Sequence, residues 1–249
     1  MNKRLLVLAF LLCLVSFAMF KAALGQTIIA GVDIGDTFTY HLYSYWTSSD
    51  AYASMPAGLL DYNRTAAYEV RISNVTGSDI EIFSATYFSN GSSPIANRGS
   101  VNIQSGDSYG GFSAIISSNL TENERIHPLG PDTITINQTV TRSFESGIRQ
   151  ANRINIIARN DTIGVTSSVD RYFDKVTGML VEETDTTSYD NPSSTVIIKW
   201  TLVASSVWSI PEFPAILALP IIMVATACAL FAIKKRWINS GNTLPSKAY

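Results

Sequence analysis

The chain has 249 residues, of which 46% are hydrophobic, and its 20 acidic and 18 basic residues give a formal net charge of −2. A weakly acidic balance of this kind argues against nucleic-acid binding, which needs a basic surface. The two cysteines, Cys13 and Cys228, each lie in a long apolar run, so the region between those runs can hold neither a disulfide nor a cysteine–zinc site.

Residues 1–25 have the layout of a secretory signal peptide. Two cations stand within the first four positions, an apolar run covers residues 5–20, and small residues precede Gly25. We therefore expect cleavage between Gly25 and Gln26. An uncleaved signal anchor is the alternative, and Lys21, which follows the apolar run directly, slightly favours it.

Residues 26–209 form the predicted extracellular domain, with 19 acidic and 11 basic residues. Apolar and polar side chains alternate along much of it, which is the period of a half-buried strand. This alternation is clearest at 37–46, 68–73, 80–87, 101–103, 134–144, 154–158, 163–173 and 196–202, with a more polar strand at 180–188. Short connections, such as the Gly-containing loop 174–178, favour antiparallel neighbours. We predict a mainly β domain: an antiparallel meander of about eight or nine strands, forming a curled sheet or a partly open barrel.

One short helix is expected within this domain, because four apolar residues follow helical spacing. Phe112, Ile115, Ile116 and Leu120 stand at i, i+3, i+4 and i+8. A helix of about nine residues is not stable alone, so it should dock on the concave face of the sheet. That architecture resembles bacterial lipoprotein-carrier half-barrels, whose helices cover a lipid-binding hollow. The helix could cover such a hollow here, or it could fill the hollow as core.

Six Asn-x-Ser/Thr sequons lie in the predicted extracellular domain, and Asn191 is excluded because Pro192 follows it. The candidate glycosylation sites are Asn63, Asn74, Asn90, Asn119, Asn137 and Asn160. Most of them fall in predicted turns or on polar faces of strands, so we interpret the domain as a glycoprotein. The alternative is that a sequence rich in Asn, Ser and Thr produces sequons by chance.

An enzyme is difficult to assemble from the remaining polar residues. His41 and His127 are far apart, and neither a nucleophile elbow nor a phosphate-binding or HExxH motif is present. Glu182 and Glu183 are adjacent, so on a strand they point to opposite faces and cannot act as an acid/base pair. A turn flanked by Asp185, Asp190 and Asn191 lacks the spacing of a calcium loop. We predict no catalytic, metal or cofactor residues, with a surface hydrolase as the alternative.

The last apolar stretch, residues 215–233, contains no charge and would make a helix of about 28 Å, enough to cross a bilayer. A Pro-rich linker, 210–214, precedes it, and a basic tail, 234–249, follows it. Three consecutive cations at the start of the tail, Lys234, Lys235 and Arg236, predict a cytoplasmic tail and an extracellular domain. These cations also disfavour the alternative of a buried helix in a soluble domain.

The linker motif of Pro211, Glu212, Phe213 and Pro214, followed by a span and the basic cluster, resembles the archaeal PEF-CTERM tail, a sorting signal or anchor of surface proteins. Thirteen further residues, 237–249, follow the cluster here, which favours a retained anchor over proteolytic sorting. The stretches TITINQTVTRSFESGIRQANRI and YFDKVTGMLVEE are similar to uncharacterised β-rich archaeal exported domains. The resemblance implies an archaeal cell-surface protein and implies no activity.

The sequence therefore predicts a single-span surface glycoprotein that acts as a binding or structural module of the cell envelope. The expected partners are the membrane, envelope or surface-layer proteins, and a small apolar ligand. Two alternatives stay open, a surface enzyme and a lipid or small-molecule carrier with a half-barrel pocket.

Overall fold

The computed structural model describes residues 28–207. The predicted signal peptide with its Gly25–Gln26 cleavage site lies outside the described residues. The linker 210–214, the predicted membrane helix 215–233 and the basic tail 234–249 lie outside them too. Within the described part of the chain, no helix has both the length and the apolar character needed to span a membrane.

The domain is built on one antiparallel sheet of ten strands, in the order β5-β4-β3-β2-β1-β10-β9-β8-β7-β6. The elements are β1 (Thr37–Ser48), α2 (Ala57–Arg64), β2 (Thr65–Thr76), β3 (Asp79–Phe88), β4 (Ile95–Asn102), β5 (Ser108–Tyr109), β6 (Gln138–Phe144), β7 (Gly147–Asn160), β8 (Val165–Asp174), β9 (Leu180–Asp190) and β10 (Ser193–Ser205). Strands adjacent in sequence pair with each other except β5 and β6, and the β1–β10 pair joins the two halves.

This topology confirms the predicted antiparallel meander and corrects the number of strands from eight or nine to ten. The sheet does not close, because β5 and β6 occupy its two edges. The strand predicted at 101–103 covers only the end of β4. The residues of β4, Ile95–Asn102, include two Asn, an Arg and a Gly, and their apolar and polar side chains hardly alternate. Sequence patterning missed β5 because that strand has only two residues. Short irregular edge strands of this kind protect a sheet from pairing with other chains.

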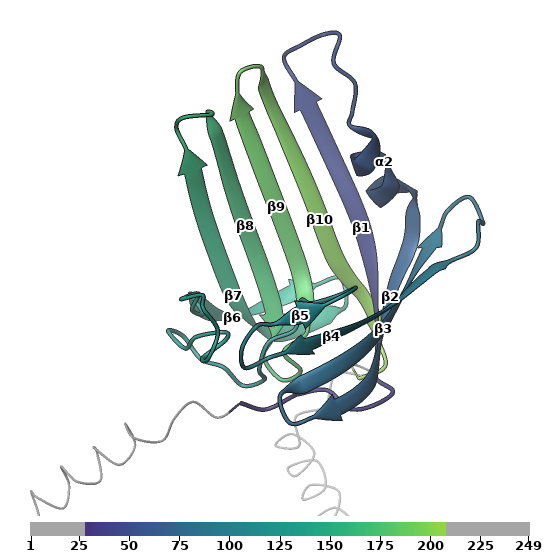
Figure 1. Cartoon of the computed structure of the whole chain (residues 1–249), viewed down its shortest axis with the longest axis vertical. Coiled ribbons are helices and arrows are strands. Elements are labelled where there is room, and N and C mark those ends of the chain that lie inside the picture. The colour runs from purple at the N-terminus through teal and green to yellow at the C-terminus, as the bar shows by residue number, and fades with distance from the viewer. Residues whose placement is uncertain (1–27, 208–249) are drawn as a thin grey trace, which may run out of the picture. The chain divides into compact units, whose positions relative to one another are not determined.

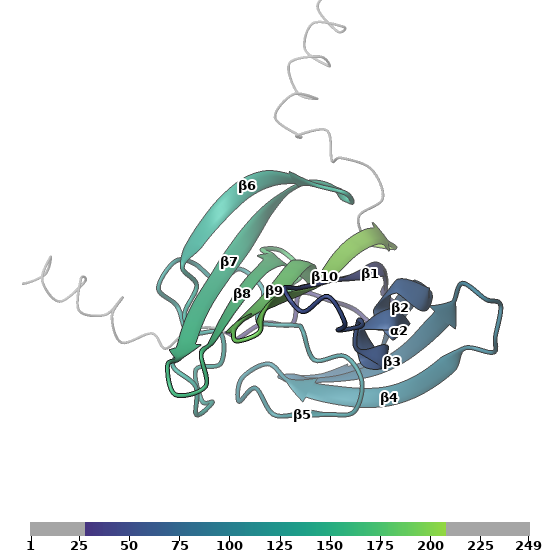
Figure 2. The same cartoon turned by 90° about the horizontal axis from the view of Figure 1, so that it is seen from above.

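The sheet curls, so that its two edges lie on opposite sides of the central strands (Figure 2). The long strands β7, β8, β9, β10 and β1 rise side by side, and the irregular segments gather near their lower ends (Figure 1). The β6–β7 hairpin arches over one face of the sheet, where Phe144, Ala151, Tyr172 and Val181 form a small separate core. Arg142 fixes this hairpin, since its Nη2 donates to Glu182 Oε1 at 2.8 Å.

The main core lies on the opposite face of the sheet, which we call the core face; the side under the β6–β7 hairpin is the outer face. Strands of both halves contribute to it, and so do the N-terminal segment and the connection between β5 and β6. Its largest fully buried side chains are Phe38, Tyr40, Ile72, Ile80, Ile82, Ile103, Ile115, Leu120, Ile136, Met179, Leu180 and Leu202. One continuous core of this size is what a domain of about 180 residues needs.

The helix predicted over residues 112–120 is wrong, although all four apolar residues that suggested it are buried in the main core. The segment is extended, and its backbone pairs with the loop between β8 and β9: Ile116 N donates to Gly178 O at 3.0 Å, and Ile115 forms a bridge with Met179. Gly178 has a φ of +73°, and a Cβ at this position would lie 2.0 Å from Ile116 O. The serine-rich, β-branched sequence favours this extended conformation over a helix.

The single helix within residues 28–207 is α2, which lies between the predicted strands 37–46 and 68–73 in a polar stretch where no helix was expected. It begins after Pro56, a residue compatible with a helix start, and buries only Leu59. Ser44 of β1 holds it through its side chain and its backbone: Ser44 Oγ donates to Leu59 O at 2.5 Å, and Ser44 N donates to Asn63 Oδ1 at 2.8 Å. Because one buried apolar residue gives no periodic signal, hydrophobic spacing could not reveal this helix.

Candidate binding hollow on the core face

A hollow of about 340 Å³ opens on the core face of the central strands. Strands β7 to β10 form its back wall, the extended segment 111–116 and the loop around Ile126 form another side, and Tyr68 of β2 with Tyr62 of α2 completes the lining. Its volume falls in the range of small-molecule sites, roughly 300–1,000 Å³. The hollow is therefore large enough to hold a small ligand.

Four aromatic side chains pack together beside this hollow. The ring centroid of Trp200 lies 5.2 Å from that of Tyr68 and 6.4 Å from that of Phe112, and Tyr40 lies 5.3 Å from Phe112. Tyr40 is fully buried and donates its hydroxyl to Leu180 O at 2.9 Å, and burial raises its pKa well above the ordinary value. Burial also raises the pKa of Tyr68. Both phenols therefore stay neutral, so the aromatic wall carries no charge.

Three charged side chains line the hollow next to the aromatic wall. Arg171 of β8 is paired in register with Glu183 of β9, which is paired with Trp200 of β10. Asp185 lies two residues beyond Glu183 on β9 and therefore points to the same face. Arg171 Nη2 donates to Glu183 Oε1 at 3.0 Å. Arg171 Nε lies 3.0 Å from Glu183 Oε2, an ion pair whose N–H direction falls outside hydrogen-bond geometry.

The electrostatics of this group are dominated by the burial of Glu183. Burial raises its pKa to about 7, Arg171 opposes the shift, and the neighbouring Asp185 adds to it. One oxygen of Asp185, Oδ1, is buried without a hydrogen-bond partner among the described residues. Leaving a buried acceptor unpaired costs about 1–3 kcal/mol, and more for a charged group. A protonated Glu183 can hydrogen-bond to Asp185, so Asp185 Oδ1 lacks a donor when Glu183 is ionised. The hollow thus contains two carboxyl groups, one guanidinium and, at a pH above the pKa of Glu183, an unused acceptor.

Above the charged group, the core face continues as an apolar track along the upper halves of the central strands. One row of paired residues across β7 to β10 begins this track and contains Ile156, Val169, Asp185 and Ile198. Asp185 is the charged end of the track, and Val196 follows on the same face. These apolar residues are half-buried, or exposed in the case of Ile156. In Figure 1 this part of the sheet rises beyond the irregular segments that cover its lower end. The apolar track therefore extends from the charged group of Arg171, Glu183 and Asp185 along the upper halves of the strands.

The lower rim of the hollow is stiffened by polar contacts within the loop 125–132. Arg125 donates to the backbone carbonyls of Pro128, Gly130 and Asp132. His127 Nδ1 lies 2.9 Å from Asp132 Oδ2. A loop held by its own side chains keeps the hollow open in a fixed shape, which lowers the entropy cost of binding.

The structure separates several polar residues that sequence inspection considered for chemistry. Glu182 and Glu183 point to opposite faces, as predicted: Glu182 meets Arg142 and Lys199 on the outer face, whereas Glu183 meets Arg171 in the hollow. His127 lies at the rim, and His41 lies on the outer face, 4.0 Å from Glu145. Within residues 28–207, no three His, Cys, Asp or Glu side chains are grouped as a metal site would require.

The predicted glycosylation sites are spread over the domain and do not form one cluster. Asn63, Asn90, Asn119, Asn137 and Asn160 are exposed, and Asn74 is half-buried. Each of these six amides makes a hydrogen bond within the domain; for example, Asn63 Nδ2 donates to Ser44 O at 2.9 Å, and Asn137 Oδ1 accepts from Asn155 N at 2.6 Å. Their modification stays a prediction.

The charged group in the hollow was missed by sequence reasoning, although one signal for it exists. Arg171 stands on the apolar face of its strand, between Val169 and Phe173. An arginine among core-facing positions needs a buried partner, so it predicts a carboxylate on a neighbouring strand. Which carboxylate that is depends on the register of β8 with β9, and the register is shifted between Tyr172 and Phe173.

Comparisons of the chain with protein-family models and with curated proteins find no match. Among solved structures, the chain is similar to a presumed exported protein with a YmcC-like fold from Bacteroides fragilis. The TM-score is 0.36 at 10% sequence identity, over 73% of this chain and 100% of that chain. Similarity at this level identifies neither an activity nor a ligand.

Proposed function

We propose that the protein is a membrane-anchored binding module of the cell envelope, and that the hollow on the core face holds a small amphiphilic ligand. The observation that carries this proposal is the buried, unpaired Asp185 Oδ1 inside a hollow with an aromatic wall. A ligand with a hydrogen-bond donor would satisfy that oxygen, and its apolar part would cover the track above it.

The charge of the hollow selects a basic head group. Two carboxyl groups and one guanidinium leave an excess of negative charge when Glu183 is ionised. A protonated amine would donate to Asp185 and be attracted by the faces of Trp200 and Tyr68, since aromatic faces attract cations. A carboxylate ligand would instead meet two like charges. The preferred ligand is therefore an amine with an apolar body.

Calorimetric titration of the full-length protein with three small compounds of similar size tests this preference. We expect 2-phenylethylamine to bind at least about tenfold more tightly than 2-phenylethanol or 3-phenylpropionate, because one charge-assisted hydrogen bond contributes about 1.5–3 kcal/mol. Asp185→Asn should abolish the preference. Asp190→Asn, an exposed acid of the same strand that pairs with Arg159, should preserve it. Equal binding of all three compounds, or no binding at all, would contradict the proposal.

The location of the protein is proposed from the sequence. We place it on an archaeal cell surface, with residues 215–233 as a retained membrane anchor of the PEF-CTERM-like type. Protease added to intact cells stripped of any outer coat should digest the domain 26–209 and spare the tail 237–249, because cations beside a span stay cytoplasmic. Permeabilised cells should lose both parts. Cleavage of the tail from outside intact cells would reverse the proposed orientation.

A further inference from the structure

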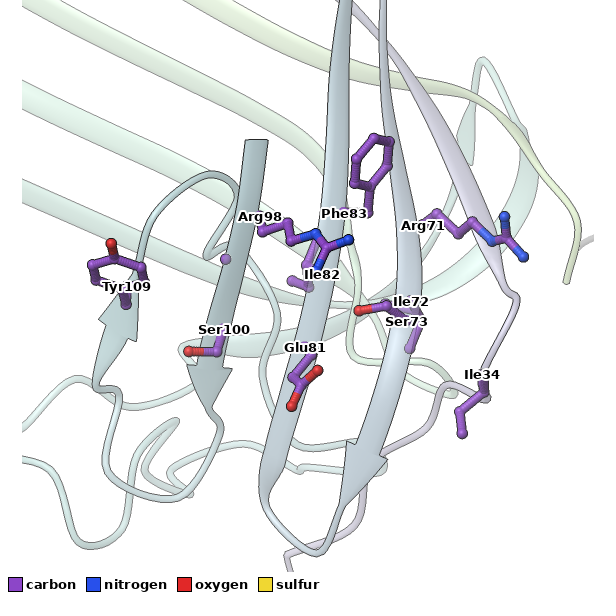
Figure 3. A pocket seen from close by; sticks show the side chains of 11 residues that line it. Ile34, Arg71, Ile72, Ser73, Glu81, Ile82, Phe83, Arg98, Ser100 and Tyr109 are labelled. Atoms are coloured by element: carbon purple, nitrogen blue, oxygen red, sulfur yellow. The ribbon is translucent and has the colours of Figure 1, made fainter. Parts of the chain in front are cut away.

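A second candidate site lies on the outer face of β2, β3 and β4, on the side of the sheet opposite the core. Arg71, Phe83 and Arg98 are paired in register across these three strands, so their side chains form one row (Figure 3). The row lies in a shallow groove of about 640 Å³, which runs from Ile34 to Tyr109. We call it the outer-face groove.

The groove exposes an unusual combination of groups. Phe83 is 39% exposed although it is a large apolar side chain, and Tyr109 at the end of the groove is 79% exposed. Arg71 and Arg98 are exposed on either side of Phe83, and among residues 28–207 no carboxylate forms an ion pair with either guanidinium. Other arginines of the sheet, such as Arg153 with Asp170, are paired at 2.7 Å. Two free guanidinium groups thus flank a flat apolar ring.

We propose that the outer-face groove binds an acidic sugar ring, a uronic-acid unit of a polysaccharide. The apolar face of the sugar would lie on Phe83, and its carboxylate would be held by Arg71 and Arg98. Neighbouring strands are about 4.8 Å apart, so the two arginines start about 10 Å apart across β3, which is within reach of one anion for side chains of this length.

The remaining polar residues of the groove match the hydroxyl groups of such a sugar. Glu81 lies two residues from Phe83 on the same face and is directly paired with Ser100. Glu81 Oε1 accepts a long hydrogen bond, 3.5 Å, from Asn74 Nδ2. Its carboxylate can accept hydrogen bonds from sugar hydroxyls. A bare inorganic anion would gain nothing from Phe83.

The test uses full-length protein made in a host without N-glycosylation, so that no glycan at Asn74 lies near the groove. We expect an oligogalacturonate to bind and an uncharged galactose oligomer of equal length to bind at least about tenfold more weakly, with binding that weakens as salt is added. Arg71→Ala and Arg98→Ala should each reduce affinity roughly tenfold. Arg64→Ala, which removes an exposed arginine of α2, should bind like the parent.

Several outcomes would overturn this inference. Equal binding of the neutral oligomer would remove the role of the arginines, and competition by inorganic phosphate at equal concentration would remove that of the sugar ring. Unchanged affinity in both arginine variants would place the sugar elsewhere. Phe83→Leu keeps an apolar side chain and loses the flat ring, so unchanged affinity would also exclude stacking. Because the groove and the hollow lie on opposite faces, failure here leaves the amine site untouched.

Discussion

Replacing Ile115 by aspartate is expected to lower the free energy of unfolding by several kcal/mol. Ile115 is 1% exposed, lies in the main core, and is bridged to Met179 next to the β8–β9 loop. A carboxylate here would be buried among apolar groups without a partner. At about 2–4 °C per kcal/mol for a domain of this size, the melting temperature should fall by roughly 10 °C or more.

Thermal unfolding of the full-length protein, followed by near-ultraviolet circular dichroism, measures this effect. Ile163→Asp is the matched control, because the same substitution occurs at a side chain that is 66% exposed in a turn. Its effect should stay within about 0.5 kcal/mol, as for ordinary surface changes. If Ile115→Asp melted within a degree of the parent, the segment 112–120 would not pack against the core face.

The second large effect is a pH-dependent gain in stability from Glu183→Gln. The pKa of Glu183 is raised to about 7 in the folded protein from the ordinary value of 4.5. A raised folded pKa contributes stability that is fully present below the unfolded pKa and is lost as pH rises through the folded pKa. The parent should therefore lose on the order of 2–3 kcal/mol from this group between pH 4.5 and pH 8.

Glutamine cannot ionise, so Glu183→Gln should be more stable than the parent at pH 8.5 and about equal to it near pH 5. Urea unfolding at the two pH values checks the prediction. Glu182→Gln is the neighbouring control: it faces Arg142 and Lys199 on the outer side, so its loss should bring no gain at pH 8.5. A stability difference between Glu183→Gln and the parent that did not change with pH would mean that Glu183 is not the titrating group.

The strands were predictable because their signal is local. Alternating residues such as Phe38 and Tyr40, or Ile80 and Ile82, fix a strand and its buried face together, and all four are buried on the core face. Short turns then fix the antiparallel order. Gly178 in the β8–β9 loop, which has a left-handed backbone conformation, could also be identified from the short loop sequence between two strands.

The conformation of residues 112–120 was not predictable, because a helical spacing of apolar residues does not require a helix. The spacing of Phe112, Ile115, Ile116 and Leu120 satisfies a helical pattern, but an extended segment that crosses a core can bury the same residues. Its backbone partners, among them Gly178 and Lys175, are more than 50 residues away in sequence. Periodicity shows which residues are buried. It does not distinguish a helix from an extended segment whose backbone hydrogen bonds are made with distant residues.

The hollow and the outer-face groove could not be read from the sequence because each is a product of register. Arg171 meets Glu183, and Phe83 lies between Arg71 and Arg98, only because particular residues of separate strands are paired. A shift of one residue would turn either set to the opposite face. Single residues, such as an arginine on an apolar face, indicate that a site exists and not where it is.

The amine site in the hollow is tested most directly by the indole signal of Trp200 in a nuclear magnetic resonance titration with 2-phenylethylamine. Trp200 is paired with Glu183 and lines the hollow, so its signal should shift in a saturable way and return when the amine is removed. In Asp185→Asn the same shift should need at least about tenfold more amine, because one charge-assisted hydrogen bond is lost. A Trp200 signal that does not move in the parent while the amine binds, or that moves equally in Asp185→Asn, would contradict a ligand site in the hollow.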